Sequence, residues 1–257
     1  MNERAFPEER MDQIQDLLQA RGRVSVNQLV DRFGVSAVTI RSDLATLEHQ
    51  GKLIRTHGGA MSKPDTGMEP AFALRQRICV AEKERIGRAA AALVQDGEAI
   101  ALDASTTSWH VARQLKERRE LTVVTNCLQI ALEFIDAPHI TVVMPGGTLR
   151  AASASLVGLL GVDLLQRYYV QKAFFGARGF TLEEGLTDVN QHEVELKNSI
   201  VKRAKEVIAV VDATKWGQVA FASFAPLDQI DRVITDAAAP SEMVAALRQR
   251  NIQVTLV

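Results

Sequence analysis

Cysteine is scarce in this chain, with only Cys79 and Cys127 among 257 residues. Two cysteines make neither a disulfide framework nor a zinc-ligand spacing, so each is expected to pack as a small hydrophobic side chain. The five histidines lack metal-ligand spacing, and neither a glycine-rich Walker pattern nor a Ser/His/Asp set is present. We therefore predict no metal, no nucleotide and no other cofactor.

Long hydrophobic runs are also absent. No segment approaches the roughly 20 apolar residues of a membrane span, and the polar N-terminal sequence MNERAFPEER lacks the apolar stretch of a signal peptide. The net charge is -1 and the hydrophobic content is 47%, which suffices for a small module and one larger core. We expect a cytoplasmic protein with no membrane partner.

Residues 24–60 predict two short helices, a tight turn and a hairpin. Ser25 followed three residues later by Gln28 is a capping-box pattern that begins the first helix. Gly34 is expected to end that helix, and Ser36 to begin the second. This order is typical of a winged helix-turn-helix that binds double-stranded DNA.

The second helix has an apolar face and a polar face. Ile40, Leu44 and Leu47 point toward the core of the small domain, whereas the opposite face carries short or polar side chains that fit a major groove. The wing that follows supplies cations for phosphates. The predicted DNA contacts are Ser36, Val38, Thr39, Arg41, Ser42, Lys52, Arg55 and His57.

An ordinary helical bundle could produce the same two amphipathic helices, although the wing argues against it. The charge of this region is balanced, because residues 1–62 contain eight Lys or Arg and eight Asp or Glu. A near-neutral module is expected to bind phosphates modestly. We therefore expect a homo-oligomer, a dimer or tetramer, that places two or more copies on one DNA site.

Three regions are expected along the chain. Residues 1–60 form the DNA-binding domain. Residues 61–75 form a linker, because its first ten residues, MSKPDTGMEP, include two prolines and have no hydrophobic period. Residues 76–257 form a domain for effector sensing and oligomerisation.

The large domain alternates apolar strand candidates with helical segments, which predicts an α/β fold with a mostly parallel sheet. Its strand candidates with their following loops are AIALDASTT, LTVVTN, ITVVMPGG, KAFFGARG, EVIAVVDATK and RVITD. Each ends in small or polar residues. Ligands of open α/β sheets bind outside the carboxyl ends of the strands, so a polar crevice is expected there.

Asp103 is followed by Ser105, Thr106 and Thr107, which lead into a helix. Hydroxyls and backbone N–H groups at a helix N-terminus form an anion site, and phosphate is its usual occupant. Helix capping accounts for one of the three hydroxyls. The other two favour a phosphate-binding loop.

Other strand ends add candidates, each with a simpler explanation. The two glycines after the third strand are as well explained by a turn, and an acid and a lysine four residues apart by a surface ion pair. A lysine in a strand-end loop is harder to explain by packing. The further candidate effector contacts are Thr125, Asn126, Gly146, Gly147, Arg150, Asp188, Glu193, Lys197 and Lys215.

Taken together, the motifs resemble the DeoR family of bacterial transcriptional regulators over nearly the whole chain. The matching blocks, in the family's order, are VSVNQLVDRFGVSAVTIRSDLATLEHQGKLIRTHGGA, EKERIGRAA, LDASTT, VVTN, MPGG, FFGARG, GLTDVNQHEVELK and VVDATKWG. The resemblance implies a repressor of sugar catabolism genes that acts as an oligomer. It also implies a C-terminal domain that is similar to ribose-5-phosphate isomerase-like folds and senses a phosphorylated sugar.

Four positions depart from the family's pattern. Ser42 stands where a second arginine is common in the reading helix, and Ser105 stands where the phosphate loop usually has glycine. Thr214 replaces a serine, and Asp188 replaces a threonine. These changes keep the hydroxyls that a phosphate needs, but they leave the identity of the sugar open.

The expected function is a DNA-binding repressor of a sugar or sugar-alcohol operon that a phosphorylated sugar releases from its operator. The alternative is an isomerase-like enzyme in which carboxylates and a lysine transfer a proton. An isomerase does not need the N-terminal module, so we predict that the chain is not an enzyme. The sequence leaves open the sugar, the operator and whether ligand weakens or strengthens DNA binding.

Overall fold

The computed structural model describes residues 7–21, 23–49, 52–56, 58–62 and 71–257. The chain divides into two compact units, residues 1–69 and 70–257, each of which is described by itself. This division lies inside the range 61–75 that was expected to be a linker. The last four residues of that range form helix α4 (Phe72–Arg75), and Phe72 is buried in the C-terminal unit.

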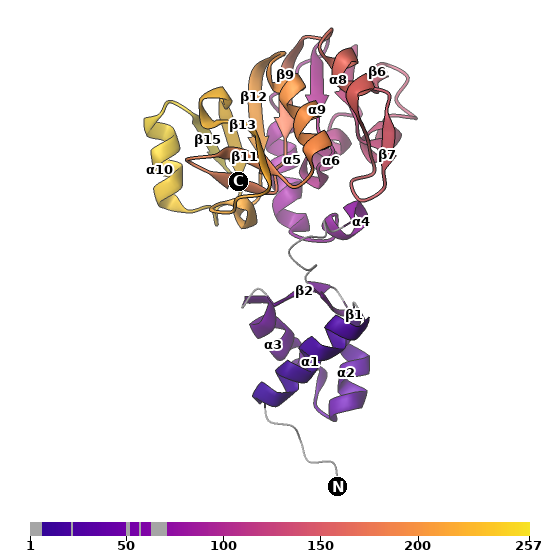
Figure 1. Ribbon diagram of the computed structural model, residues 1–257, viewed down its shortest axis with the longest axis vertical. Coiled ribbons are helices and arrows are strands. Elements are labelled where there is room, and N and C mark those ends of the chain that lie inside the picture. Colours follow the sequence, from indigo (N-terminus) through magenta and orange to yellow (C-terminus); the bar gives the residue numbers. More distant parts are fainter. Residues whose placement is uncertain (1–6, 22, 50–51, 57, 63–70) are drawn as a thin grey trace. The chain divides into compact units, whose positions relative to one another are not determined.

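The N-terminal unit is a winged helix-turn-helix, as predicted (Figure 1). Its strands form one antiparallel sheet in the order β1-β3-β2, with β2 and β3 as the wing. The elements are α1 (Pro7–Arg21), β1 (Arg23–Ser25), α2 (Val26–Phe33), α3 (Ala37–His49), β2 (Leu53–Thr56) and β3 (Gly59–Ser62).

The predicted signals lie at the two ends of α2. The Ser25 hydroxyl accepts a hydrogen bond from the Gln28 N–H at 3.1 Å, and the Gln28 side chain accepts one from the Ser25 N–H at 3.0 Å. Gly34 ends α2 with a φ of +63°, a left-handed conformation that glycine adopts without a steric cost. The predicted capping box and helix end are therefore confirmed.

The core of this unit lies between α1, the sheet and the inner face of α3. Ile40, Leu44 and Leu47 of α3 are buried with Ile14 and Leu18 of α1, as their spacing predicted. Because all three helices contribute to a single small core, the orientation of α3 depends on its packing against α1 and α2.

The C-terminal unit is built on a seven-stranded sheet in the order β15-β14-β12-β9-β4-β5-β6 (Figure 1). All of its neighbouring strands pair in parallel, as predicted. The strands are β4 (Ala99–Leu102), β5 (Leu121–Thr125), β6 (Ile140–Val143), β9 (Val170–Phe175), β12 (Ala204–Val210), β14 (Arg232–Thr235) and β15 (Gln253–Leu256).

Apolar side chains cover both faces of this sheet, which explains the nearly continuous apolar strands. Alternate residues of a strand point to opposite faces, so Ile100 and Leu102 join one core and Ala101 joins the other. The helices that follow α4 are α5 (Val80–Ala91), α6 (Thr106–Arg113), α7 (Leu128–Glu133), α8 (Leu159–Leu165), α9 (Gln191–Val201) and α10 (Ser241–Gln249).

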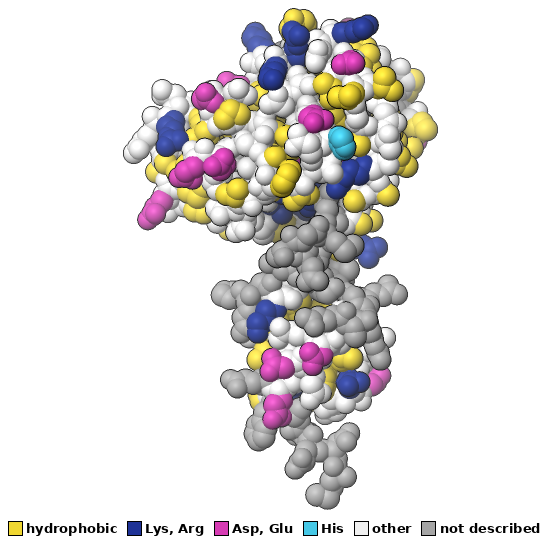
Figure 2. All heavy atoms as spheres, in the orientation of Figure 1, with side chains coloured by type: hydrophobic (Ala, Val, Ile, Leu, Met, Phe, Trp, Pro, Cys, Tyr) yellow, Lys and Arg dark blue, Asp and Glu magenta, His cyan; other side chains and the backbone are white. Residues whose placement is uncertain are grey.

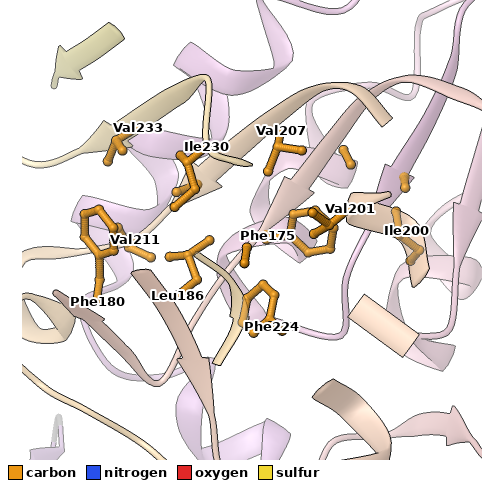
Figure 3. Packing of buried hydrophobic residues seen from close by; sticks show 14 of the residues in the cluster. Phe175, Phe180, Leu186, Ile200, Val201, Val207, Val211, Phe224, Ile230 and Val233 are labelled. Carbon is orange, nitrogen blue, oxygen red and sulfur yellow. The ribbon is translucent and has the colours of Figure 1, made fainter. Parts of the chain in front are cut away.

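A second sheet packs with α9 in one of these cores. It has three antiparallel strands in the order β10-β11-β13 and was not anticipated from the sequence. Figure 3 shows Leu186 and Phe224 of this sheet near Phe175 of β9, and Phe180 beside Val211. The rings of Phe175 and Phe224 lie 5.6 Å apart. The strands are β10 (Gly179–Thr181), β11 (Gly185–Asp188) and β13 (Ala222–Ala225).

A short antiparallel ribbon, β7 (Thr148–Arg150) with β8 (Ser155–Val157), follows β6. Two 3-10 turns, η1 (Ala213–Lys215) and η2 (Leu227–Gln229), follow β12 and β13. The chain runs outward from β4 through β5 to β6, then returns to place β9 on the other side of β4. The strand order therefore reverses between β4 and β9, where an open α/β sheet forms its ligand crevice.

Candidate functional site

Asp103 follows β4 at this reversal point and is 1% exposed. One carboxylate oxygen, Oδ1, accepts hydrogen bonds from the Ser108 hydroxyl at 2.6 Å and from the Gly176 N–H at 3.1 Å. The other oxygen, Oδ2, lies 2.8 Å from Nζ of Lys197. Asp103 thus connects the ends of β4 and β9 with α6 and α9.

Lys197 lies at the centre of a buried charge cluster. Its Nζ is 2.6 Å from Asp188 Oδ2, donates to the Gly176 carbonyl at 3.2 Å and lies 4.7 Å from the centre of the Phe224 ring. The simpler explanation of Lys197 and Glu193 as a surface pair is wrong, because both residues are buried. Two carboxylates, Asp103 and Asp188, are the partners of Lys197 instead.

These contacts favour the charged forms of Lys197 and Asp188. Burial disfavours the ammonium of Lys197, but Asp103, Asp188 and Glu193 outweigh burial and raise the pKa of Lys197 above its ordinary value. Burial likewise acts to raise the pKa of Asp188, but the neighbouring Lys197 outweighs it and the pKa of Asp188 is lowered. The Asp188 side chain is therefore held as a carboxylate and is not placed to donate a proton.

Glu193 accepts hydrogen bonds from several side chains. Its Oε1 accepts from the hydroxyls of Ser153, at 2.8 Å, and Ser155, and its Oε2 accepts from the Asn126 amide at 3.1 Å. The guanidinium of Arg150 lies 3.9 Å from Oε1 and also donates to Ser153. These bonds bring the ends of β5 and β7, the start of β8 and the first turn of α9 together around one carboxylate.

The N-terminus of α6 provides groups for an anion. Ser105 is the capping residue, and its hydroxyl accepts from the Ser108 N–H at 3.1 Å and donates to the Ser108 hydroxyl at 3.0 Å. The hydroxyls of Thr106 and Thr107 have no hydrogen-bond partner among the described residues, although these residues are only 4% and 5% exposed. Their backbone N–H groups belong to the first turn, which has no acceptor within the helix.

Lys215 ends η1, beyond the carboxyl end of β12. Asp212 caps η1 by accepting from the Thr214 N–H at 3.0 Å and from the Thr214 hydroxyl. Lys215 is half-buried, and its ammonium has no hydrogen bond or ion pair within the described part of the chain. Among the predicted crevice cations, Lys197 already has two carboxylate partners, whereas Lys215 remains available to a bound anion.

Two glycines near the site leave no room for a Cβ atom. A Cβ at Gly147 would lie 2.3 Å from the Val157 carbonyl oxygen, and Gly147 has a φ of +142°. A Cβ at Gly176 would lie 2.4 Å from the Ser105 hydroxyl oxygen. Backbone packing alone is therefore sufficient to explain Gly147, without a ligand contact. Gly146 is exposed and has open space around it.

The remaining predicted crevice residue, Thr125, is buried and uses its hydroxyl to accept from the Cys127 N–H at 3.1 Å. Contacts within the site also involve four residues that the sequence reasoning did not select, namely Ser108, Ser153, Ser155 and Gly176. The only sequence signal for the two serines from residue 153 onward is the small-residue segment AASAS after Arg150.

Three of the predicted DNA contacts lie on the outer face of α3. Val38 is 74% exposed, and Arg41 and Ser42 are exposed beside it. Lys52, just before the wing, is exposed, and the exposed Arg55 of β2 pairs with Glu48 at 3.6 Å. His57 lies outside the described residues.

Comparison with known proteins identifies both units. Residues 10–66 match the DeoR-like helix-turn-helix domain, and residues 78–237 match the DeoR C terminal sensor domain. The chain belongs to the DeoR family. As a DeoR-family member, it is a DNA-binding transcriptional regulator and not an enzyme.

Relatives match along nearly their whole length. The chain is 39% identical to the HTH-type transcriptional regulator GolR of Listeria innocua over 231 residues, which are 90% of this chain and 91% of GolR. It is 35% identical to the HTH-type transcriptional repressor GlcR of Bacillus subtilis over 246 residues, 96% of this chain and 94% of GlcR. It is 31% identical to the glycerol-3-phosphate regulon repressor of Escherichia coli over 248 residues, 96% of this chain and 98% of that repressor.

Among solved structures, the DeoR-family chain is similar to a D-ribose-5-phosphate isomerase in complex with phospho-erythronic acid. The identity is 18%, the coverage is 52% of each chain and the TM-score is 0.40. Within the described residues, no helix has the length and apolar character needed to cross a membrane.

A buried histidine of the sensor unit predicts a pH effect on stability. His110 of α6 is 1% exposed, and neither ring nitrogen has a hydrogen-bond partner. Burial, with smaller contributions from Arg113 and Lys83, lowers the pKa of His110 to about 4, although Glu84 acts in the opposite direction. Since the unfolded imidazole has a pKa of about 6.5, the unfolded chain binds this proton first as the pH falls.

The stability that neutral His110 contributes should therefore be present above pH ~6.5 and lost between about 6.5 and 4, by at most about 1.4 kcal/mol per pH unit. His110→Leu should flatten this dependence. Urea unfolding at pH 7.5, 6 and 5 measures it, with His192→Leu as the control because His192 is exposed. An unchanged slope in His110→Leu would contradict the prediction.

Proposed function

We propose that this regulator represses a carbohydrate catabolic operon and that a phosphorylated sugar bound in the crevice releases it from the operator. One observation carries the proposal. The hydroxyls of Thr106 and Thr107, which have no partner among the described residues, follow the carboxyl end of β4. Lys215 follows the carboxyl end of β12 in the same parallel sheet, and the carboxylates around Lys197 belong to this edge as well. Two relatives, the repressor GlcR and a glycerol-3-phosphate regulon repressor, are consistent with it.

The two halves of a sugar phosphate would use different groups in this crevice. The phosphate would accept hydrogen bonds from the first turn of α6 and pair with Lys215. The sugar hydroxyls would bond to carboxylate and amide oxygens of Asp188, Glu193 and Asn126, which the cluster holds in place. Lys197 would orient carboxylates rather than bind the phosphate, because its ammonium already has three oxygen partners.

Operator binding would need more than one copy of the chain. Residues 1–62 have as many acidic as basic side chains, and Figure 2 shows both kinds on the visible face of the N-terminal unit. One near-neutral module would bind phosphates weakly. A dimer or tetramer placing α3 on repeated half-sites of double-stranded DNA would gain affinity through the high effective concentration of its second copy.

Effector and operator would oppose each other thermodynamically. A ligand that favours an arrangement unable to span the half-sites lowers operator affinity, typically by ~5 to 150-fold, and operator must then lower ligand affinity by the same factor. We propose release rather than strengthened binding because the relatives GlcR and the glycerol-3-phosphate regulon repressor are named as repressors.

The test is fluorescence anisotropy of the full-length protein on duplexes from upstream of its own and adjacent genes. Each duplex is titrated at fixed salt with paired free and phosphorylated sugars. Specific binding that one phosphosugar releases, and its free sugar does not, is the expected result. If no upstream duplex outcompetes random DNA, the repressor function is wrong.

Lys215 provides a sharper test of the phosphate site. A charge-assisted hydrogen bond contributes about 1.5–3 kcal/mol, so Lys215→Met should weaken phosphosugar binding about 10- to 100-fold. Operator affinity without ligand should stay unchanged. Lys205→Met is the matched control, because Lys205 is exposed at the start of β12. Release of Lys215→Met at the wild-type phosphosugar concentration would exclude Lys215 as a contact.

A further inference from the structure

Val38 is an unusual side chain for a protein surface. It is 74% exposed on the first turn of α3, the helix that reads DNA. Among the side chains described between residues 7 and 62, no other large hydrophobic residue is exposed. An exposed isopropyl group at this position has no role in the core, which Ile40 and Leu44 form on the opposite face.

The residues beside Val38 leave few groups free for base contacts. The Ser36 hydroxyl caps α3 by accepting from the Thr39 N–H at 3.1 Å, and it lies 2.9 Å from the Thr39 hydroxyl, so each hydroxyl already has a partner. The Thr46 hydroxyl, further along, donates to the Ser42 carbonyl at 3.1 Å. Because these hydroxyls already have partners, the exposed Val38 is the side chain of the first turn that is left for a base contact.

Val38 also belongs to a continuous outward stripe. Val38, Arg41, Ser42 and Ala45 are spaced by three, one and three residues, which places them along one side of a helix. The first turn of a reading helix contacts base edges in the major groove, and the C5 methyl of thymine is the apolar group that normal bases present there. A branched apolar side chain followed by an arginine matches a thymine methyl beside a hydrogen-bond acceptor.

We infer that Val38 packs against a thymine methyl in each operator half-site and makes this position specific for thymine. The inference rests on the proposed operator binding and adds the base that α3 selects. Arg41, one turn further along, contacts a neighbouring base edge or phosphate. Along the groove, the stripe thus makes one apolar contact followed by one cationic contact.

Deoxyuridine separates this contact from every other one, because it lacks only the C5 methyl and keeps the base pair. The preferred site is first selected with the full-length protein from a random-sequence duplex library. Each thymine of that site is then replaced by deoxyuridine, and affinity is measured by anisotropy for the wild type, Val38→Ala and the control Val80→Ala. Val80 is an exposed valine of the sensor unit.

One thymine per half-site should prove sensitive in the wild type and in Val80→Ala. Removing its methyl should weaken binding about 4-fold per half-site, the effect of one buried methyl-sized group. Val38→Ala should bind the thymine duplex more weakly and should no longer distinguish thymine from deoxyuridine there. Far-UV circular dichroism checks that the variant is folded.

Four results would overturn the inference. The wild type could bind its selected site specifically yet tolerate every deoxyuridine, which refutes the methyl contact but leaves operator binding intact. Val38→Ala could keep the full thymine preference, or could change the oligomeric state instead, which would place Val38 against another protein chain. If no sequence is enriched from the library, operator binding itself fails, and the inference fails with it.

Discussion

Lys197→Met is expected to destabilise the sensor unit by about 3–5 kcal/mol, the effect of removing one partner of a buried ion pair. Without the ammonium, Asp103 and Asp188 would face each other as buried carboxylates with no cation between them. Methionine keeps most of the aliphatic length of the lysine side chain but removes its ammonium, so the loss reflects charge more than volume. The fluorescence of Trp109 and Trp216 measures it, because both tryptophans lie in this unit.

The pH dependence identifies the cause. In Lys197→Met the two carboxylates should bind a proton more readily in the folded than in the unfolded state, so the variant should regain stability as the pH falls from 7 toward 5. Adding Asp188→Asn should recover part of the loss. The control is Lys202→Met, which alters an exposed lysine just beyond α9. Equal losses in both single variants would refute the ion-pair explanation.

Arg10→Met is expected to destabilise the DNA-binding unit by a similar amount, about 3–5 kcal/mol. Arg10 of α1 bonds Asp43 of the reading helix through Nε at 2.6 Å and Nη2 at 3.1 Å, and both side chains are buried. Removing the guanidinium leaves Asp43 buried beside the core that holds α3. Since this unit is small, a loss of that size is a large part of its total stability.

Arg10→Met and Lys197→Met should affect the unfolding of different units. Arg10→Met should shift unfolding by far-UV circular dichroism and weaken operator binding, while the tryptophan transition stays in place because neither tryptophan lies in residues 1–69. Arg32→Met, at an exposed position of α2, is the control. Arg10→Met combined with Asp43→Leu should be more stable than Arg10→Met alone. A shifted tryptophan transition in Arg10→Met would contradict the assignment.

Local sequence signals were sufficient for the N-terminal unit. The Ser25 capping box, the left-handed Gly34 and the spacing of Ile40, Leu44 and Leu47 each depend on residues within a few positions. The ion pair between Arg10 and Asp43 was missed, because its partners are 33 residues apart and no local pattern connects them.

In the sensor unit, the local signal that predicted the fold was the polar ending of each apolar strand. Each apolar run that ended in small or polar residues is a strand of the central sheet. The antiparallel sheet β10-β11-β13 was missed, because its strands have only three or four residues and are almost wholly buried, which leaves no alternating pattern. Its third strand also comes from a distant part of the chain.

The sequence by itself determined the two-part organisation, the winged helix-turn-helix, the parallel sheet and which strand ends carry polar groups, because these depend on local spacing and composition. Tertiary structure alone decided what those groups do. In the folded chain Lys197 pairs with Asp103 and Asp188, and Glu193 accepts hydrogen bonds from two serines that were not predicted. Ser105 caps α6, and Lys215 has no partner among the described residues. Burial and strand order set these partnerships, and both arise only when distant segments pack together.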